Sequence, residues 1–328
     1  GAKTLGVCFE KAPTERKTGT AGWYNTAAFH EKAKAKGLYA ETINGDAFSD
    51  EIKNETIEKI KAEMGKVDLV IYSLASPRRT DPETGVTYKS TLKPVGQAYT
   101  TKTYDTDKDK VHEVSLEPAN DEEILNTIKV MGGEDWERWM DFLREADVLA
   151  EGCKTTAYTY IGKELTWPIY GQATIGKAKE DLDRAAAAII GKNSDLLVQA
   201  NVSSLKALVT QASSAIPVMP LYISLIYKVM KEEGTHEGCI EQIQGLFERQ
   251  MYTTGQADID EDGRWRMDGE ELKDSVQAQV ATLWDKVNTD NIGELTDFKG
   301  YHQEFLRLFG FGIEGVDYEA DISPLVDL

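Results

Sequence analysis

Two side chains that could carry acid–base chemistry, Tyr170 and Lys179, stand nine positions apart. On an unbroken α-helix this spacing leaves about half a turn of rotation between them, so the two would face opposite sides. Gly171 and Gly176 lie between them, and interior glycines destabilise a helix. We therefore expect Tyr170 on a loop and Lys179 on the helix that follows, an arrangement in which the two side chains can converge.

A phenol beside an ammonium suits the reduction of a conjugated double bond. A hydride that reaches one carbon of such a bond puts negative charge on the neighbouring carbonyl oxygen, to which a phenol can donate. A free phenol has a pKa of about 10, and a nearby ammonium lowers it. Lys179 could also hold the ribose of a nicotinamide cofactor. Taken alone, the pair is better explained as a half-buried tyrosine and a solvated helix lysine.

Three segments could contact a dinucleotide, because each directly follows a predicted strand. Glu10 follows the first strand; an acid there accepts hydrogen bonds from the adenosine ribose and repels a 2′-phosphate, which favours NADH over NADPH. Asp46 and Ala47 follow the second strand, where adenine is commonly bound. Leu74 and Ala75 follow the third, where backbone approaches the cofactor. Each could instead be an ordinary exposed acid or turn residue, but three strand ends together favour a cofactor site.

Other residues offer weaker signals. Tyr160 lies near the end of a predicted strand over 153–161 and provides a second phenol. The apolar stretch Ile216–Tyr222 could line an acyl channel or belong to the core. The acidic run Asp258–Gly263 imitates a calcium loop, but the glutamate required at its twelfth position is replaced by Gly269. No metal site is therefore predicted.

The elements that would position these residues alternate between strand and helix. Strand patterns lie near 4–10, 38–43 and 67–73, with helices near 24–35 and 49–64 between them. Such βαβ units predict an α/β fold with a doubly wound, mostly parallel sheet and crevices at the carboxyl ends of its strands.

No linker, repeat or low-complexity stretch divides the chain, so we predict a single α/β domain over 1–328. Prolines and glycines interrupt the alternation at 80–117, which we interpret as an insertion at the sheet edge with a hairpin tip near 105–109. Residues 212–252 should form a helical region on the substrate side, and 253–328 a C-terminal hairpin and helix region.

The composition excludes several classes of function. Hydrophobic residues make up 41% of the chain, which is enough for a folded core. Fifty-six acidic residues against 37 basic ones leave a formal charge of −19, which argues against nucleic-acid or membrane binding. Cys8, Cys153 and Cys239 lack disulfide or zinc spacing. No apolar run reaches the roughly 18 residues of a membrane span. We expect a cytoplasmic protein.

The Tyr-x8-Lys spacing of Tyr170 and Lys179 is accompanied by further motifs: Phe9–Lys11, Gly45–Ser49, Tyr72–Pro77, Thr80–Pro82, Glu117–Asp121, Lys129–Arg138, Thr174–Lys179, Leu208–Gln211 and His236–Gln242. In these motifs the chain resembles the trans-2-enoyl-CoA reductases and FabV-type enoyl-acyl-carrier-protein reductases. The resemblance extends through essentially the whole chain. The Tyr-x8-Lys spacing distinguishes this family from relatives with Tyr-x3-Lys or Tyr-x6-Lys.

The resemblance implies a monomeric, Rossmann-like α/β enzyme related to short-chain dehydrogenases. It would reduce 2-enoyl-CoA or 2-enoyl-acyl carrier protein with NADH in fatty acid synthesis. By motif match Tyr170 is the proton donor, Lys179 contacts the cofactor, and Tyr160 contacts the substrate. Besides Lys179, the NAD site would comprise Phe9, Glu10, Asp46, Ala47, Leu74, Ala75, Leu208, Val209 and Thr210.

The family carries a first strand and a glycine-rich phosphate loop before the strand that opens this sequence. Backbone N–H groups of that loop normally hold the pyrophosphate. We therefore expect this sequence to be an N-terminally incomplete version of a reductase. Two alternatives stay open: a carbonyl reductase of related fold, and a catalytically silent, truncated binding protein.

Overall fold

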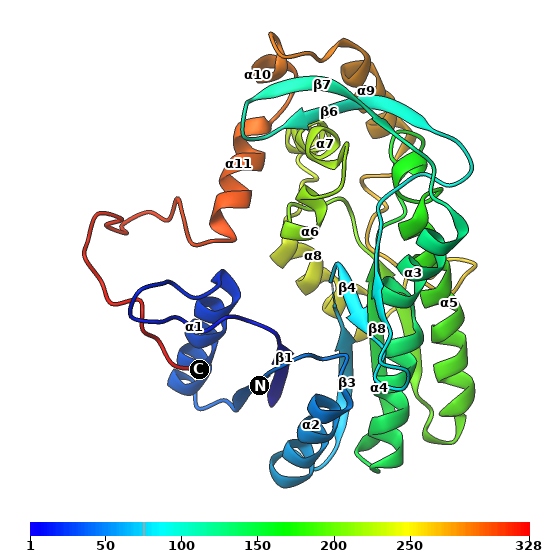
Figure 1. The fold of residues 1–328 in the computed structure, drawn as a ribbon, viewed down its shortest axis with the longest axis vertical. Helices are drawn as coiled ribbons and strands as arrows, with labels where there is room; N and C mark the ends of the chain where they lie inside the picture. Colours follow the sequence, from blue (N-terminus) through cyan, green and yellow to red (C-terminus); the bar gives the residue numbers. More distant parts are fainter. Residues whose placement is uncertain (75) are drawn as a thin grey trace.

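The computed structural model describes residues 1–74 and 76–328. A parallel four-stranded sheet with strand order β10-β9-β8-β3 lies at its centre (Figure 1). Its strands are β3 (Val67–Tyr72), β8 (Leu149–Thr159), β9 (Gln199–Ser204) and β10 (Trp265–Arg266). Because neighbouring strands are parallel, their carboxyl ends meet at one edge of the sheet, as predicted.

A second parallel pair precedes this sheet. Its strands β1 (Thr4–Cys8) and β2 (Ala40–Asn44) are connected by helix α1 (Ala21–Ala35). Within residues 1–74 and 76–328, β1 and β2 pair only with each other. The structure confirms the predicted α/β class with mostly parallel pairing, but the parallel strands form two groups rather than one continuous sheet.

Apolar side chains cover both faces of the four-stranded sheet. Alternate residues of a strand point to opposite faces. Val70 and Ala157 pack in the core beneath α4 (Glu134–Glu145) and α5 (Thr174–Lys192), whereas Leu69 and Tyr158 pack on the other side near Trp265. Burial of both faces is the arrangement expected of a doubly wound sheet. The helices on this part of the chain are α2 (Asp50–Glu63), α3 (Asp121–Met131), α4 (Glu134–Glu145) and α5 (Thr174–Lys192), followed by the short η2 (Ser194–Leu196).

The segment 80–117 contributes to two antiparallel hairpins. They pair β4 (Arg78–Thr80) with β5 (Thr87–Lys89), and β6 (Tyr99–Asp105) with β7 (Lys110–Leu116). The predicted hairpin tip is confirmed, but the position at the sheet edge is wrong for the longer hairpin, which lies over helix α7 (Met219–Glu233) (Figure 1). The reason is that Tyr104 of β6 is buried in the core around α7.

The remaining elements form a helical region around α7, whose Leu221, Ile223 and Leu225 are fully buried. A short hairpin lies in the C-terminal region, where Asp260 N–H donates to the Arg264 carbonyl (3.1 Å) and Arg266 N–H to that of Asp258 (3.0 Å). Its second arm, β10, also pairs with β9 at the edge of the sheet. The other helices here are α6 (Gln211–Ser214), α8 (Cys239–Gly245), η3 (Leu246–Met251), α9 (Asp274–Lys286), α10 (Ile292–Leu295) and α11 (Phe298–Arg307).

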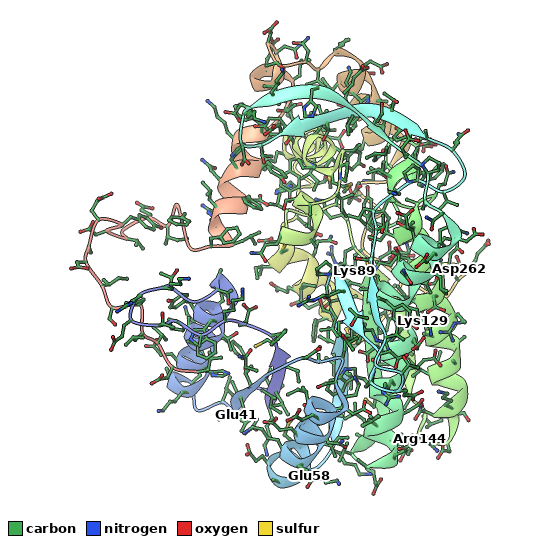
Figure 2. The ribbon with its side chains drawn as sticks, in the orientation of Figure 1. Glu41, Glu58, Lys89, Lys129, Arg144 and Asp262 are labelled. Atoms are coloured by element: carbon green, nitrogen blue, oxygen red, sulfur yellow. The ribbon has the colours of Figure 1, made fainter. Side chains whose placement is uncertain are left out.

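The end of the chain returns to its beginning. Tyr24 and Trp23 of α1 donate hydrogen bonds to the carbonyls of Pro324 (2.8 Å) and Val326 (2.7 Å). Charged side chains, among them Glu41, Glu58 and Asp262, extend from the surface (Figure 2). No helix in the described residues is both long and apolar enough to span a bilayer.

A buried ion pair fixes the loop after β2. Lys53 Nζ lies 2.8 Å from Asp135 Oδ1, and both side chains are almost inaccessible, with 0% and 2% of their surface exposed. The same ammonium donates to the carbonyls of Ala47 (2.9 Å) and Phe48 (3.0 Å), and Trp139 Nε1 also donates to Ala47 (3.1 Å). All three donors of Lys53 therefore have acceptors, and Ala47 is held rigidly.

Replacement of Lys53 should destabilise the fold strongly. Lys53→Met leaves Asp135 as an unpaired buried charge, so the free energy of unfolding should fall by about 3–5 kcal/mol. Lys59→Met is the control, because Lys59 is partly exposed and pairs with the exposed Glu63 at 3.2 Å; it should cost about 1 kcal/mol or less. Urea-induced unfolding measures both, and equal losses would contradict the prediction.

Candidate active site

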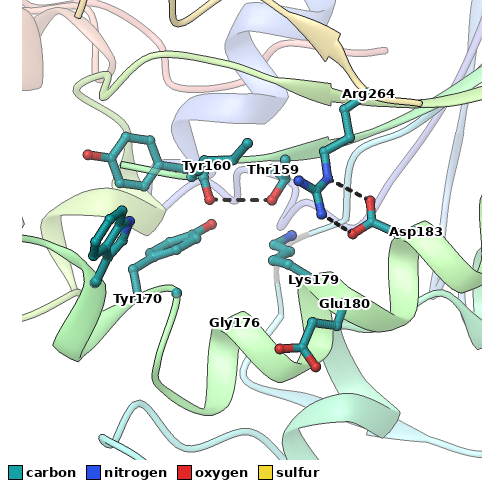
Figure 3. Close-up of a pocket in the computed structure, with 11 residues that line it drawn as sticks. Thr159, Tyr160, Tyr170, Gly176, Lys179, Glu180, Asp183 and Arg264 are labelled. Carbon is teal, nitrogen blue, oxygen red and sulfur yellow. Dashed lines mark hydrogen bonds and ion pairs between the residues drawn. The ribbon is translucent and has the colours of Figure 1, made fainter. Parts of the chain in front are cut away.

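Tyr170 and Lys179 line one cavity of about 150 Å³ at the carboxyl edge of the sheet. Their hydroxyl and ammonium groups point toward the space between them (Figure 3). The cavity has room for a ring or a short acyl chain rather than for a whole dinucleotide. Its walls come from the end of β8, the start of α5 and the strand region near β10, and they consist of Thr159, Tyr160, Ile161, Trp167, Tyr170, Gly171, Gly176, Lys179, Glu180, Asp183 and Arg264.

The local structure places the two side chains as the sequence predicted. Tyr170 follows the short helix η1 (Trp167–Ile169), and its N–H donates to the carbonyl of Thr166 at 2.9 Å. Lys179 lies on α5, which begins at Thr174. The chain therefore turns between the two residues, and this turn makes them converge. The expectation that no single helix joins the two residues is confirmed, although Gly176 itself lies inside α5.

Gly176 instead permits a close approach between the turn and the helix. A Cβ atom added there would lie 2.0 Å from the carbonyl oxygen of Gly171 and 2.6 Å from that of Tyr170. Both distances are far below van der Waals contact, and both neighbours are backbone atoms. A side chain at this position would therefore displace the turn that carries Tyr170.

Lys179 provides hydrogen-bond donors to the cavity. Its Nζ donates to the carbonyl of Tyr158 at 3.0 Å, which uses one of the three donors of an ammonium. Burial lowers its pKa to about 8, while the negative charge of Asp183 acts in the opposite direction. Arg264 holds Asp183 through two contacts of 2.9 and 2.6 Å. The remaining donors of Lys179 are available to a ligand in the cavity.

Tyr170 is a protonated phenol at neutral pH. Burial raises its pKa well above the ordinary value, and the backbone of Tyr160 opposes this only in part. The prediction that Lys179 lowers the pKa of the phenol is wrong, because desolvation dominates at this buried position. The result suits an acid, since a phenol that keeps its proton can donate it.

Tyr160 faces the same cavity with its ring. The Tyr160 and Tyr170 rings meet edge to face, with centroids 5.0 Å apart and an interplanar angle of 89°. The hydroxyl of Tyr160 donates to Glu271 Oε1 at 2.9 Å. The polar end of Tyr160 is therefore engaged by Glu271, and its ring forms part of the cavity wall.

The predicted cofactor residues after β9 do not line the cavity, but Val209 packs in the same core as two of the tyrosines that do. Val209 belongs to the same buried cluster as Tyr160 and Tyr170, and its N–H donates to Tyr227 Oη at 3.2 Å. Leu208 is buried beside it, and Thr210 caps helix α6. These residues follow the carboxyl end of β9.

The predicted cofactor residues after β1 and β2 do not line the cavity. Phe9 is exposed, and Glu10 accepts a hydrogen bond from Thr20 at the start of α1. Asp46 accepts from the N–H of Phe48 at 3.0 Å, beside the buried Ala47. Leu74 is half-buried after β3, and Ala75 lies outside the described residues.

Several residues of the site were missed by sequence reasoning. Arg264 and Asp183 are far apart in the sequence, and Arg264 stands in the acidic run that imitates a calcium loop. Ion pairs account for part of that run, since Asp260 lies 3.3 Å from Arg266 and Asp262 lies 2.9 Å from Arg264. The alternation of acidic and basic residues was the available signal. Glu271 carried no signal at all.

A family model described as the trans-2-enoyl-CoA reductase catalytic region matches residues 17–252. The chain belongs to this enoyl reductase family. A second model, described as an enoyl reductase FAD binding domain, matches residues 259–322. The resemblance predicted from Tyr170, Lys179 and the accompanying motifs is thus confirmed.

Individual relatives agree with this assignment. An enoyl-[acyl-carrier-protein] reductase [NADH] of Pseudoalteromonas atlantica is 75% identical over 327 residues, which cover 100% of this chain and 83% of that protein. One of Idiomarina loihiensis is 67% identical over 326 residues and is covered to the same extent of 83%. The crystal structure of Treponema denticola trans-2-enoyl-CoA reductase in complex with NAD has a TM-score of 0.96 and 51% identity, covering 100% of this chain and 82% of that one.

Addition of one methyl group at Gly176 should damage the site. Gly176→Ala forces the turn that carries Tyr170 away from α5, so we expect a stability loss of about 1–3 kcal/mol and a fall of reductase turnover of roughly tenfold or more. Gly191→Ala on the same helix is the control, because its Cβ would meet nothing within 4 Å. Thermal unfolding and initial rates test both, and a Gly176→Ala enzyme with normal turnover would refute the constraint.

Proposed function

We propose that this chain reduces the 2,3-double bond of trans-2-enoyl thioesters of CoA or acyl carrier protein with NADH. Family membership carries the proposal. The names of close relatives specify an NADH-linked enoyl reductase, and related reductases have been crystallised with NAD and NADH. The chain is therefore an oxidoreductase of the enoyl reductases, and the predicted activity and cofactor agree with these names.

The residues proposed to hold the cofactor are Lys179 on α5 and residues that follow strands of the fold. Lys179 offers its unused donors to the nicotinamide ribose, and Leu208–Thr210 follow the neighbouring strand β9. Glu10 lies at the end of β1, where its carboxylate suits the adenosine ribose diol. Asp46, Ala47, Phe9, Leu74 and Ala75 complete the proposed set. When bound, NADH supplies a hydride to the β-carbon of the enoyl group.

Tyr170 is the proposed proton donor. As the β-carbon gains hydrogen, the electron pair of the double bond moves toward the thioester oxygen, which becomes negative. The protonated phenol of Tyr170 donates to that oxygen, and one proton finally reaches the α-carbon, so that two hydrogens are added across the double bond. The ring of Tyr160 forms the adjacent wall for the acyl group.

The C-terminal segment does not fit a flavin dinucleotide, although the second family model is described by that cofactor. The pyrophosphate of a dinucleotide is commonly held by the N–H groups of a helix N-terminus. The helices of this segment begin with acidic residues at or within their first turn: Asp274 in α9, Glu294 in α10 and Asp297 at the cap of α11. These carboxylates would repel a pyrophosphate, so no step of the proposed reaction involves flavin.

We further propose a cytoplasmic monomer with one α/β domain over 1–328, acting in fatty acid synthesis. The family resemblance supports the monomer and the pathway, and the absence of a linker, repeat or low-complexity stretch in the sequence supports the single domain. The state of the cysteines agrees with a reducing compartment, since the described Cys8, Cys153 and Cys239 are all free.

The acid role of Tyr170 can be tested by removing its hydroxyl. Oxidation of NADH with crotonyl-CoA measures turnover, and a simple ketone in place of the thioester tests for a carbonyl reductase. Tyr170→Phe should lower turnover about 100-fold or more, because the general acid is lost. Tyr252→Phe, at an exposed tyrosine outside the cavity, is the control. Normal turnover of Tyr170→Phe, or faster reduction of the ketone, would contradict the proposal.

The pH dependence of NADH binding tests the role of Lys179. Burial lowers the pKa of the Lys179 ammonium to about 8 in the protein without cofactor. The charged form of this side chain favours the anionic cofactor. NADH affinity should thus be constant below pH about 7 and fall as the pH rises through about 8, where Lys179 loses its proton. Fluorescence titration with NADH at several pH values measures this. Lys179→Met should abolish the dependence, whereas Lys177→Met, which removes an exposed pair with Glu180 on the same helix, should retain it.

A further inference from the structure

Glu271 is a fully buried carboxylate behind the wall of the cavity, with 0% of its surface exposed. Tyr160 and Tyr222 both donate to its Oε1, at 2.9 and 2.8 Å. The N–H of Ala207 donates to its Oε2 at 2.5 Å. The donors come from three elements, namely the end of β8, helix α7 and the segment after β9, so this one side chain joins them.

The surroundings satisfy this carboxylate completely. Gln277 donates to the Tyr222 hydroxyl (3.0 Å) and to the Glu271 carbonyl (2.7 Å). Burial raises the pKa of the Glu271 carboxyl, and the positive charge of the buried Lys206 opposes this rise. A buried polar network in which every member is satisfied restricts the rotamers of its side chains.

Tyr160 connects Glu271 to the active site, because it contacts both Glu271 and Tyr170. Its hydroxyl is held by Glu271, while its ring packs edge to face against the ring of Tyr170 at 5.0 Å. Both rings line the cavity that also contains Lys179 (Figure 3). Rotation of Tyr160 would therefore remove the support against which Tyr170 rests.

We propose that Glu271 is a positioning residue that orients Tyr160 and, through it, the proton donor Tyr170. The segment after residue 258, which does not fit a flavin, would on this view complete the substrate side of the active site by supplying Glu271. The inference rests on the proposed function, because it assigns Glu271 a part in the same reaction.

A double-mutant cycle tests the proposal with crotonyl-CoA and NADH. Glu271→Gln keeps the shape of the side chain but presents an N–H₂ group to donors, so kcat/KM should fall about 10- to 100-fold while NADH affinity stays normal. In a Tyr160→Phe background the same substitution should cause less than a twofold further loss, because its effect passes through the Tyr160 hydroxyl. Glu270→Gln is the matched control, since the neighbouring Glu270 side chain is exposed and pairs with Lys273.

If Glu271→Gln folds, either of two results would overturn the proposal. One is normal kcat/KM in a folded Glu271→Gln enzyme, and the other is additive losses in the double mutant, as a purely structural role requires. If Glu271→Gln does not fold, Tyr160→Phe and Tyr222→Phe are compared instead. Each removes one hydroxyl that donates to Glu271 Oε1. Tyr160→Phe should lose several-fold more turnover than Tyr222→Phe, and equal losses would refute the proposal. A wild-type protein without crotonyl-CoA turnover would instead refute the proposed function, and this inference with it.

Discussion

The contact between Gly171 and Gly176 is the constraint on which the site depends. The carbonyl of Gly171 lies so close to the first turn of α5 that no side chain fits at position 176. This contact lets the chain leave η1, reverse, and enter α5 within a few residues. Tyr170 at the start of the reversal and Lys179 on the second turn of α5 consequently open into one cavity.

The buried lysines show why Lys179 is suited to bind a ligand. Lys53 has three acceptors within 3.0 Å, so its ammonium is saturated and serves the fold. Lys206 donates to the carbonyl of Ala207 and lies 4.7 Å from the centroid of the Tyr227 ring, where its charge also offsets Glu271. Lys179 has one protein acceptor and lines a cavity. Burial lowers the pKa of all three lysines, so what distinguishes Lys179 is its position at a cavity.

Local patterns made much of the fold and the reacting pair predictable. Helical and strand periodicities gave the βαβ alternation, and glycines between Tyr170 and Lys179 indicated a turn. The separation of β1 and β2 from the main sheet could not be predicted, because periodicity identifies a strand but not its partner. The position of the β6–β7 hairpin failed for the same reason: Tyr104 could have been buried by any neighbouring element, and only the tertiary structure places it against α7.

The residues that surround Tyr170 and Lys179 could not be predicted in this way, because their contacts join distant parts of the sequence. Glu271 meets Tyr160 over a separation of 111 residues, and Arg264 meets Asp183 over 81. Such contacts leave no spacing to recognise, because each partner is an unremarkable acid, base or phenol in its own segment. Chemistry at the cavity depends on both levels: the local turn brings Tyr170 and Lys179 together, and the distant carboxylates fix the side chains that surround them. A Tyr-x8-Lys motif transplanted without those carboxylates would keep its spacing but lose the restraint on Tyr160 and on Arg264.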